Sequence, residues 1–500
     1  LAGDGDPGGI ATVPYRGLYC AVQSSTLYED SAIPSDIYYA ALDGDWNGDG
    51  DSLWGEPGED DLFCEISVGR MPVDSRAEAS AMISKTMMYQ ESPVAGDARS
   101  ALMLGEHLWS DPETWGGDEL DQLIGLCDKW GFVTDGIPAD FDISRYYDRD
   151  LGSWPASTVW TEADSGTAWI CHAGHSNYLY AMGMHISDVD TANFTNDGIT
   201  AGYPVVYTYG CYAGAFDRDD CIAEQMVTIE TFAAAALCHS RYGWFTEGTT
   251  NGPSHHLQRE FFDAVFGEGS TRLGEALSRA RDETVPFLDL PEEYEPGAHR
   301  WCFYCLNLLG DPAMDAWTGA ITPLGADHPA SIGREDSLFF AETSLEGVTA
   351  ALFSEGSLLG RAISGPDGRI VIPLCAAVPD TADTVVLTLT AHDMSHYREM
   401  LPVTETTGAG IPPATASLGR ISPNPFNPSA TVTFELPSRC EVDLSAYSVD
   451  GRRVARLAGG LMEPGPHTVT WRPTRLASGV YLLVLRAGGS VMARKAVLLR

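Results

Sequence analysis

The chain has 500 residues, of which 44% are hydrophobic and 20% charged, so its composition is that of a globular protein and not of a disordered one. Thirty lysines and arginines against 70 acidic residues give a formal net charge of -40, which argues against nucleic acid as a partner and favours binding of cations. A chain of this length is too long to fold around a single hydrophobic core, so roughly two to four domains are expected. No apolar run reaches the roughly 18 residues that a membrane helix needs.

An acidic segment over residues 45–56 has the spacing of a calcium-binding loop. Oxygen-bearing side chains fall at loop positions 1, 3, 5, 7 and 12, and a glycine stands at position 6. The five candidate ligands are Asp45, Asn47, Asp49, Asp51 and Glu56. Because so many carboxylates in one turn repel one another, we expect a calcium ion to order this segment. The alternative is a solvated acidic turn, and the flanks lack the helices of an EF-hand.

Two helices and a strand are expected next along the chain. Residues 74–91 predict a helix capped by Asp74. Its expected apolar face consists of Ala79, Met82, Ile83 and Met87. Residues 101–105 predict a strand that ends at Glu106, a candidate third member of a catalytic triad or, alternatively, an ordinary loop acid. Residues 120–130 predict a helix that ends at Gly131.

Two short runs of β-branched and aromatic residues, 168–171 and 204–209, predict strands that are buried on both faces. His175 follows the first run and Cys211 the second. Neighbouring parallel strands would bring this imidazole and this thiol to one sheet edge, where α/β proteins bind ligands.

The chemistry of a thiol explains why the two residues would belong together. Free cysteine has a pKa near about 8.5, so an imidazole is needed to leave a nucleophilic thiolate at neutral pH. We therefore predict Cys211 as nucleophile and His175 as base, with the backbone N–H groups of Gly174 and Cys211 binding an oxyanion. The alternative is a core cysteine with an internally satisfied histidine, and the glycines beside both residues favour the catalytic interpretation.

Alternation of strands and helices continues downstream, with a helix expected over 220–229 and a strand over 231–238. This order predicts a parallel sheet with helices on both faces. The pair His255-His256 favours a helix start over a metal site. The single Cys302/Cys305 pair favours packing, with a redox or disulfide role left open.

From about residue 321 the sequence consists of short runs in which apolar and polar residues alternate, separated by turn-forming residues. This pattern predicts a β-sandwich up to about residue 405. A linker rich in small residues and proline follows over 406–420. Residues 421–500 hold ten Lys and Arg against five Asp and Glu, a net charge of +5, so residues 1–420 carry -45. This change of sign indicates a domain boundary and a second β module.

The motifs at the two strand ends resemble those of the gingipain-like cysteine peptidases, a caspase-related α/β family. The family's Gly-His-Gly step corresponds to GHS at 174–176, and its cysteine motif corresponds to CYAGAFD at 211–217. Upstream, PSDIYYAALDGDWNGDGD and EISVGRMPVDSRAEA are similar to the family, and similar segments continue to about residue 316.

This resemblance implies a catalytic domain that cleaves peptide bonds, after basic residues in the family's known members, and it favours His175 over His172 as the base. It also implies an N-terminally truncated chain, because LAGDGDP at 1–7 resembles a strand end from inside that domain. Ser176 stands where the family usually has glycine. If it distorts the loop, an oxyanion-binding N–H group is misaimed and the protein is a non-catalytic form.

Within the last module, SPNPFNP at 422–428, VDGR at 449–452 and ASGVY at 477–481 resemble the C-terminal sorting domain of the type IX secretion pathway. They are also similar to the immunoglobulin-like fold of flagellar hook-capping proteins. The resemblance implies a secretion machinery as a partner and a location that is secreted or at the bacterial cell surface.

Together these patterns predict a caspase-like α/β domain over 1–318, followed by two all-β immunoglobulin-like sandwich domains over 319–405 and 421–500. The predicted function is that of a secreted cysteine endopeptidase with protein or peptide substrates, a structural calcium ion, no nucleic-acid partner and no transmembrane segment. The alternative is a non-catalytic, calcium-ordered surface protein for binding or adhesion on the same scaffold.

Overall fold

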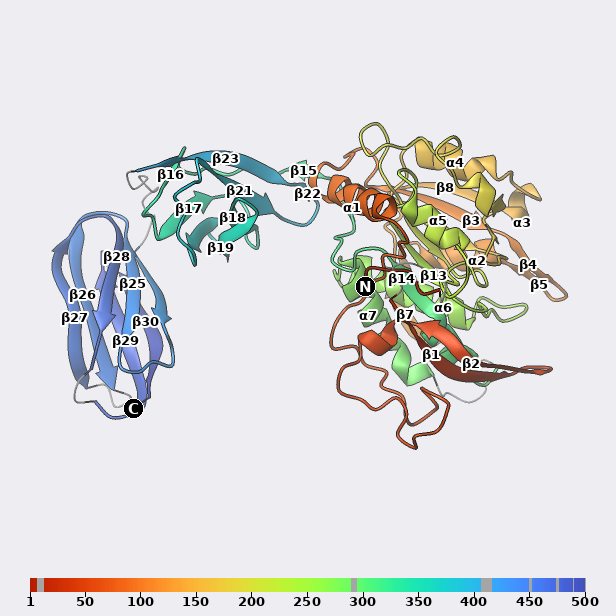
Figure 1. The fold of residues 1–500 in the computed structure, drawn as a ribbon, viewed down its shortest axis with the longest axis horizontal. Helices are drawn as coiled ribbons and strands as arrows, with labels where there is room; N and C mark the ends of the chain where they lie inside the picture. Colours follow the sequence, from red (N-terminus) through yellow and green to blue (C-terminus); the bar gives the residue numbers. More distant parts are fainter. Residues whose placement is uncertain are drawn as a thin grey trace. The chain divides into compact units, whose positions relative to one another are not determined.

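The computed structural model describes residues 1–6, 13–288, 295–405, 416–448, 452–473, 476–488 and 490–499. The chain forms two compact units, which Figure 1 shows as an α/β part and a β-rich part. The first unit comprises Leu1–Leu324 and Thr390–His396, and the second comprises Gly325–Leu389 and Tyr397–Arg500. No helix among the described residues combines the length and apolarity needed to cross a lipid bilayer.

The short segment Thr390–His396 was expected in the first β-sandwich but packs with the α/β unit. Its strand β22 (Met394–Ser395) pairs in parallel with β15 (Thr322–Pro323), and the Asp393 carboxylate accepts the backbone N–H of Thr318 at 3.0 Å. Residues 406–415 of the predicted linker over 406–420 lie outside the described residues. The end of the predicted linker belongs to a strand, β24 (Ser417–Ser422).

A six-stranded sheet in the order β14-β13-β12-β9-β3-β8 forms the centre of the first unit (Figure 1). Its members are β3 (Ser100–Gly105), β8 (Asp142–Tyr147), β9 (Trp169–Ala173), β12 (Val205–Thr208), β13 (Ala235–His239) and β14 (Leu306–Leu309). All neighbouring pairs are parallel except β13 and β14. The predicted parallel neighbours β9 and β12 are confirmed, with Trp169 opposite Val205 and His172 opposite Thr208.

Successive residues of the central strands face two separate hydrophobic layers, which explains their continuous apolar sequence. Trp169 and Tyr207 pack in the layer of α6 (Pro253–Phe262), α7 (Leu273–Thr284) and α8 (Ala298–Cys305). Ile170 and Val206 pack in the layer of α1 (Arg76–Glu91), α4 (Ser157–Asp164) and α5 (Ile222–Thr228). Each fully buried large side chain contributes about 1.5–3 kcal/mol. The predicted helices on both faces of the sheet are therefore confirmed.

Helix α1 differs from the prediction in its cap and in its buried face. Ser75, not Asp74, is the N-cap, because its side chain accepts the Glu78 N–H while the Glu78 carboxylate accepts the Ser75 N–H. The buried positions are Ala81, Met82, Lys85 and Tyr89, whereas Ile83 and Met87 are half exposed. A buried lysine, whose Nζ donates to the Thr231 carbonyl at 2.9 Å, interrupts the apolar pattern.

The helix predicted over 120–130 is wrong. The chain forms a short helix, α2 (Gly116–Leu120), and then a hairpin of β6 (Leu126–Lys129) and β7 (Phe132–Asp135). Trp130 and Gly131 have φ angles of 61° and 83°. Two consecutive positive φ angles belong to the tight turn of a hairpin, so Gly131 is a turn residue and not a helix cap.

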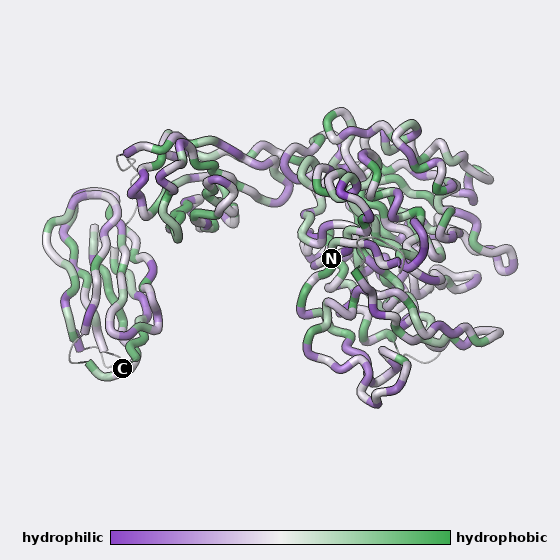
Figure 2. The backbone as a smooth tube through the Cα atoms, in the orientation of Figure 1, coloured by the Kyte–Doolittle hydropathy of each residue, from purple (hydrophilic) through white to green (hydrophobic). Residues whose placement is uncertain are grey.

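The remaining parts of the first unit are hairpins and loops around the sheet. They include β1 (Arg16–Gln23), β2 (Leu27–Ser35), β4 (His107–Ser110), β5 (Glu113–Trp115), α3 (Asp148–Leu151), β10 (Tyr180–Ala181) and β11 (Met184–His185). The loop over residues 43–61 is hydrophilic along most of its length (Figure 2). It is held to the core by Trp46, which is 3% exposed.

The second unit contains two all-β modules, each with two sheets. The first has the sheet β16-β23-β21-β18-β19 and the pair β17-β20. Its strands are β16 (Ile332–Gly333), β17 (Leu338–Glu342), β18 (Thr349–Ser354), β19 (Ser357–Ile363), β20 (Arg369–Pro373), β21 (Thr384–Thr390) and β23 (Tyr397–Thr404). Alternating burial along β18 and β21 confirms the predicted alternation.

The C-terminal module pairs its strands as β24-β25-β28 and as β27-β26-β29-β30. The strands not yet given are β25 (Ala430–Leu436), β26 (Cys440–Ser448), β27 (Arg453–Met462), β28 (Gly465–Trp471), β29 (Gly479–Ala487) and β30 (Ser490–Leu498). Trp471, Phe426 and Tyr481 pack together in its core. Most of the VDGR motif at 449–452 lies outside the described residues.

Candidate active site

The predicted nucleophile and base follow the two central strands of the sheet, β12 and β9. Cys211 is partly exposed, and its Sγ lies 3.7 Å from the Gly243 carbonyl oxygen. Burial raises the pKa of the Cys211 thiol above its ordinary value. The thiol is therefore protonated at neutral pH unless a base takes its proton.

The loops that carry the two residues touch through Ser176. Its Oγ donates a hydrogen bond to the Cys211 carbonyl at 2.8 Å. Gly210 makes this approach feasible, because a Cβ at that position would lie 2.1 Å from Ser176 Oγ. The serine that departs from the family pattern thus connects the base loop to the nucleophile loop.

His175 is exposed and is held at both its ring and its backbone. Its Nε2 lies 3.2 Å from the carbonyl oxygen of Leu108 in β4, and its backbone N–H donates to Glu106 Oε2 at 2.7 Å. Since a carbonyl can only accept, the neutral ring carries its proton on Nε2. The lone pair therefore resides on Nδ1, which leaves this nitrogen able to accept a proton.

Glu106 contacts the predicted base through the backbone of His175 and not through its imidazole. Its other carboxylate oxygen, Oε1, lies 3.2 Å from Nε2 of His172. Burial would raise the pKa of the Glu106 carboxyl, but the hydrogen bonds from His172 and from the His175 N–H lower it below its usual value. This arrangement differs from the expected triad, in which the carboxylate would orient the ring of the base.

Gly174 lies between these groups, and its lack of a side chain is required there. A Cβ at Gly174 would lie 2.4 Å from Nε2 of His172 and 2.5 Å from Cδ of Glu106. His172 itself is fully buried, with its Nδ1 2.8 Å from Thr208 Oγ1. The rival base considered from the sequence therefore lies inside the sheet, away from solvent.

An aromatic cluster lies beside the nucleophile, and sequence patterns alone did not place it there. Tyr212, which has a φ of 59°, contacts Tyr242, and Tyr28 of β2 contacts both Tyr242 and Trp244. Tyr28 and Tyr242 are 38% and 40% exposed, so part of their ring surface faces solvent near the nucleophile loop.

The acidic loop brings part of its predicted ligand set together. Carboxylate oxygens of Asp49, Asp51 and Glu56 lie within 4.8 Å of one another. Asn47 Oδ1 is buried and has no hydrogen-bond partner among the described residues, while Asp45 Oδ1 accepts the Asn47 N–H at 3.2 Å. Partial burial, followed by the charges of Asp51 and Asp49, raises the pKa of the Glu56 carboxyl.

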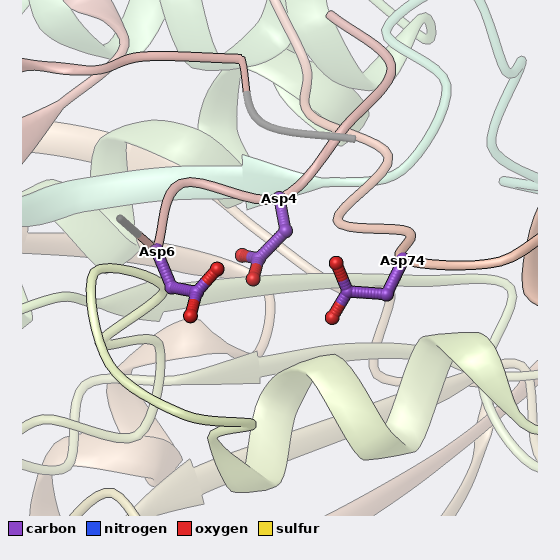
Figure 3. A group of neighbouring side chains, drawn as sticks. All are labelled: Asp4, Asp6 and Asp74. Atoms are coloured by element: carbon purple, nitrogen blue, oxygen red, sulfur yellow. The ribbon is translucent and has the colours of Figure 1, made fainter. Parts of the chain in front are cut away.

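A second cluster of carboxylates, Asp4, Asp6 and Asp74, lies beside α5, and the three groups point toward one another (Figure 3). Asp4 is 4% exposed, and burial raises its pKa to about 6. Asp43, Asp61 and Glu65 form a third, more exposed group. Neither cluster follows a metal-binding spacing in the sequence, and neither was predicted.

Comparison with known proteins identifies the family to which this site belongs. The sequence profile of peptidase family C25 matches residues 1–317. The chain belongs to peptidase family C25. Among curated proteins, gingipain R2 from two strains of Porphyromonas gingivalis is 20% identical over an alignment of 460 residues, which covers 87% of this chain and 57% of the relative. The chain therefore spans a little over half the length of these relatives.

Solved structures show that the fold is that of family C25. The crystal structure of the Arg-specific cysteine proteinase gingipain R has a TM-score of 0.59 at 16% identity and covers 81% of this chain and 83% of that one. A further structure, described as a protease, has a TM-score of 0.60 at 16% identity over 81% of this chain and 82% of that chain. The caspase-like α/β class predicted from the sequence is thereby confirmed.

The contact between Gly210 and Ser176 generates a stability prediction for this C25 chain. Gly210→Ala is expected to lower the free energy of unfolding by about 1–3 kcal/mol, because its Cβ overlaps Ser176 Oγ. Adding Ser176→Gly should restore at least half of the loss, because it removes both serine atoms that overlap the new Cβ, while the Gly174 carbonyl oxygen lies 3.3 Å away.

The measurement is chemical unfolding, with Gly96→Ala as the control because a Cβ at Gly96 meets no atom within 4 Å. Equal losses in the single and double variants would show that the two loops are not in the described contact.

Proposed function

We propose that this protein is a cysteine endopeptidase in which Cys211 attacks the scissile carbonyl and His175 acts as the base. Membership of family C25 and the joined loops of Cys211 and His175 support the proposal. The observation that carries it is the fixed tautomer of His175, whose Nε2–H points to the Leu108 carbonyl. Nδ1 is then available to take the thiol proton.

The reaction follows from this protonation state. Transfer of the Cys211 proton to Nδ1 leaves a thiolate, which adds to the carbonyl carbon and forms a tetrahedral intermediate. The backbone N–H groups of Gly174 and Cys211 would stabilise its oxyanion. The imidazolium of His175 gives its proton to the leaving amine, and water then hydrolyses the thioester. Glu106 acts by fixing the backbone of His175 and does not touch the substrate.

Cleavage after basic residues is part of the proposal. A related structure is that of an Arg-specific proteinase, and residues 1–420 of this chain carry a net charge of -45. The rings of Tyr28, Tyr242 and Trp244 offer faces on which a guanidinium could stack. Both features favour a positively charged substrate residue.

Peptide cleavage by the full chain tests the proposal directly. Cys211→Ala should abolish cleavage, and His175→Ala should lower kcat by about 10²–10⁴-fold. Peptides with arginine before the scissile bond should be cleaved at least about tenfold faster than peptides with citrulline, which has the same shape without the charge. Equal rates for both peptides would remove the basic specificity and leave the peptidase.

Thiol alkylation provides a second measurement of the same proposal. Cys211 should react faster than Cys375, an exposed free thiol of the same chain. In His175→Ala, Cys211 should need a more alkaline pH than Cys375 to react, because burial raises the Cys211 pKa and no base remains. Absence of cleavage together with a Cys211 no faster than Cys375 would favour the non-catalytic binding protein.

We also propose that calcium orders the loop over residues 45–56. The converging carboxylates of Asp49, Asp51 and Glu56 and the buried, unpartnered Oδ1 of Asn47 support this. Gly50 has a φ of 74° at the sixth loop position, where a calcium loop turns sharply. Asp45 would complete the set of oxygen ligands.

Calcium is expected to raise the unfolding free energy by about 2.7 kcal/mol at a free concentration of roughly 100 times Kd. Thermal unfolding with calcium and with a chelator measures this difference. Asp49→Asn should remove most of it, whereas Asp128→Asn, which makes the same charge change at an exposed hairpin position, should not. Equal unfolding temperatures with calcium and chelator would contradict the proposal.

The C-terminal module over 421–500 is proposed to direct export through a secretion machinery to the medium or the cell surface. Its net charge of +5 against -45 for the preceding residues supports a separate role for this module. In a bacterium with a type IX pathway, the full chain should reach the cell surface or medium, while a chain ending at residue 405 should stay inside. Equal distribution of both chains would refute this role.

A further inference from the structure

A buried chain of hydrogen bonds connects the backbones of the two catalytic loops. It runs from Glu106 through His172 of β9 and Thr208 of β12 to the backbone of Gly210. His172 Nε2 lies 3.2 Å from Glu106 Oε1, and Nδ1 lies 2.8 Å from Thr208 Oγ1. The Gly210 N–H donates to Thr208 Oγ1 at 3.1 Å. Both His172 and Thr208 are fully buried.

Every donor in this hydrogen-bond chain has an acceptor, and the directions of the hydrogen bonds agree with one another. An ionised Glu106 can only accept, so Nε2 of His172 carries the proton. Nδ1 then accepts from the Thr208 hydroxyl, whose oxygen accepts from the Gly210 N–H. A neutral imidazole therefore completes the chain without leaving a buried polar atom unpaired, which would be costly at 0% exposure.

Both ends of this hydrogen-bond chain are bonded to the backbone of a catalytic loop. Glu106 Oε2 accepts the N–H of His175, and Thr208 accepts the N–H of Gly210, the residue before Cys211. Because β9 and β12 pair with His172 opposite Thr208, the two side chains bridge the strands at their carboxyl ends. The spacing between the base loop and the nucleophile loop therefore depends on these buried side chains.

We propose that His172 is a positioning residue, which holds the loops of His175 and Cys211 at their reactive separation through Glu106 and Thr208. The inference rests on the proposed peptidase function. His172 is excluded as the base by its burial, and it exchanges no proton with substrate. Its imidazole serves as a rigid connector between a carboxylate and a hydroxyl.

The test compares Thr208→Val with Thr208→Ser in the full chain. Valine has nearly the shape of threonine but lacks the hydroxyl, so the connection to Gly210 is cut. Serine keeps the hydroxyl. We expect Thr208→Val to lower kcat by about 10–100-fold per titrated active site with KM within about twofold, and Thr208→Ser to stay within about threefold of wild type.

A second variant addresses the other end of the chain. The amide of His172→Asn can reach Thr208 but is too short to reach Glu106, so it should lower kcat to a similar extent. Combining it with Thr208→Val should cost little more than either change alone, because both cut one connection. All assays are made below the unfolding temperature of each variant.

The rate constant for alkylation of Cys211, corrected for the folded fraction of each variant, separates positioning from folding. It should fall in Thr208→Val and recover in Thr208→Ser. A Thr208→Val variant with wild-type kcat and alkylation rate would overturn the role of His172 while the peptidase stands. A wild-type chain without cleavage, with Cys211 no faster than Cys375, would overturn both proposals.

Discussion

Parallel pairing between β9 and β12 is the constraint on which the rest of the site depends. The register that places His172 opposite Thr208 also brings the residues after each strand, Gly174-His175 and Gly210-Cys211, to one edge of the sheet. Hydrogen bonds of parallel strands are evenly spaced, so a shift of one residue would displace every later contact. The strands are buried on both faces, so a shift in register would require the side chains of both layers to repack.

Close packing at the sheet edge explains which residues the loops can hold. Gly174 and Gly210 lie where a Cβ would overlap polar side chains of the opposite loop or of Glu106. Ser176 donates to the Cys211 carbonyl in the same place, so a small hydroxyl is compatible with the contact. The serine that replaces the family's glycine is thus accommodated by a hydrogen bond between the loops, and this geometry by itself gives no reason to regard the serine as a defect.

The sequence was sufficient to predict the sheet, its helical layers and the edge that carries Cys211 and His175, because buried parallel strands have a distinctive apolar composition. It was not sufficient for α1, where the buried Lys85 breaks the apolar stripe and forms its own hydrogen bond to Thr231. The helix predicted over 120–130 was also wrong, because Trp130 and Gly131 adopt positive φ angles and form the turn of a hairpin in a segment whose apolar pattern is helical. Local composition does not reveal such tertiary effects.

Contacts between distant residues account for what the sequence missed in the site. Glu106 follows its strand as expected, yet its hydrogen bonds to the His175 backbone and to the ring of His172 depend on the pairing of β3 with β9. Thr208 gave one signal, a hydroxyl at the end of an apolar run, but its partner lies 36 residues away. Tyr28 reaches the aromatic cluster beside Cys211 from a separate hairpin, and no spacing in the sequence links it to Cys211.

The large excess of acid is accommodated in chemically different ways, according to where each carboxyl lies. Asp36 is buried against Arg70 at 2.6 Å, and Asp217 pairs with Arg241 at 2.8 Å. Glu106 keeps its charge through hydrogen bonds, whereas burial raises the pKa of Glu260 to about 8 and thereby favours its neutral form. In the loop over 45–56 the carboxylates of Asp49, Asp51 and Glu56 converge on one another, and there the calcium ion proposed above would offset the charge.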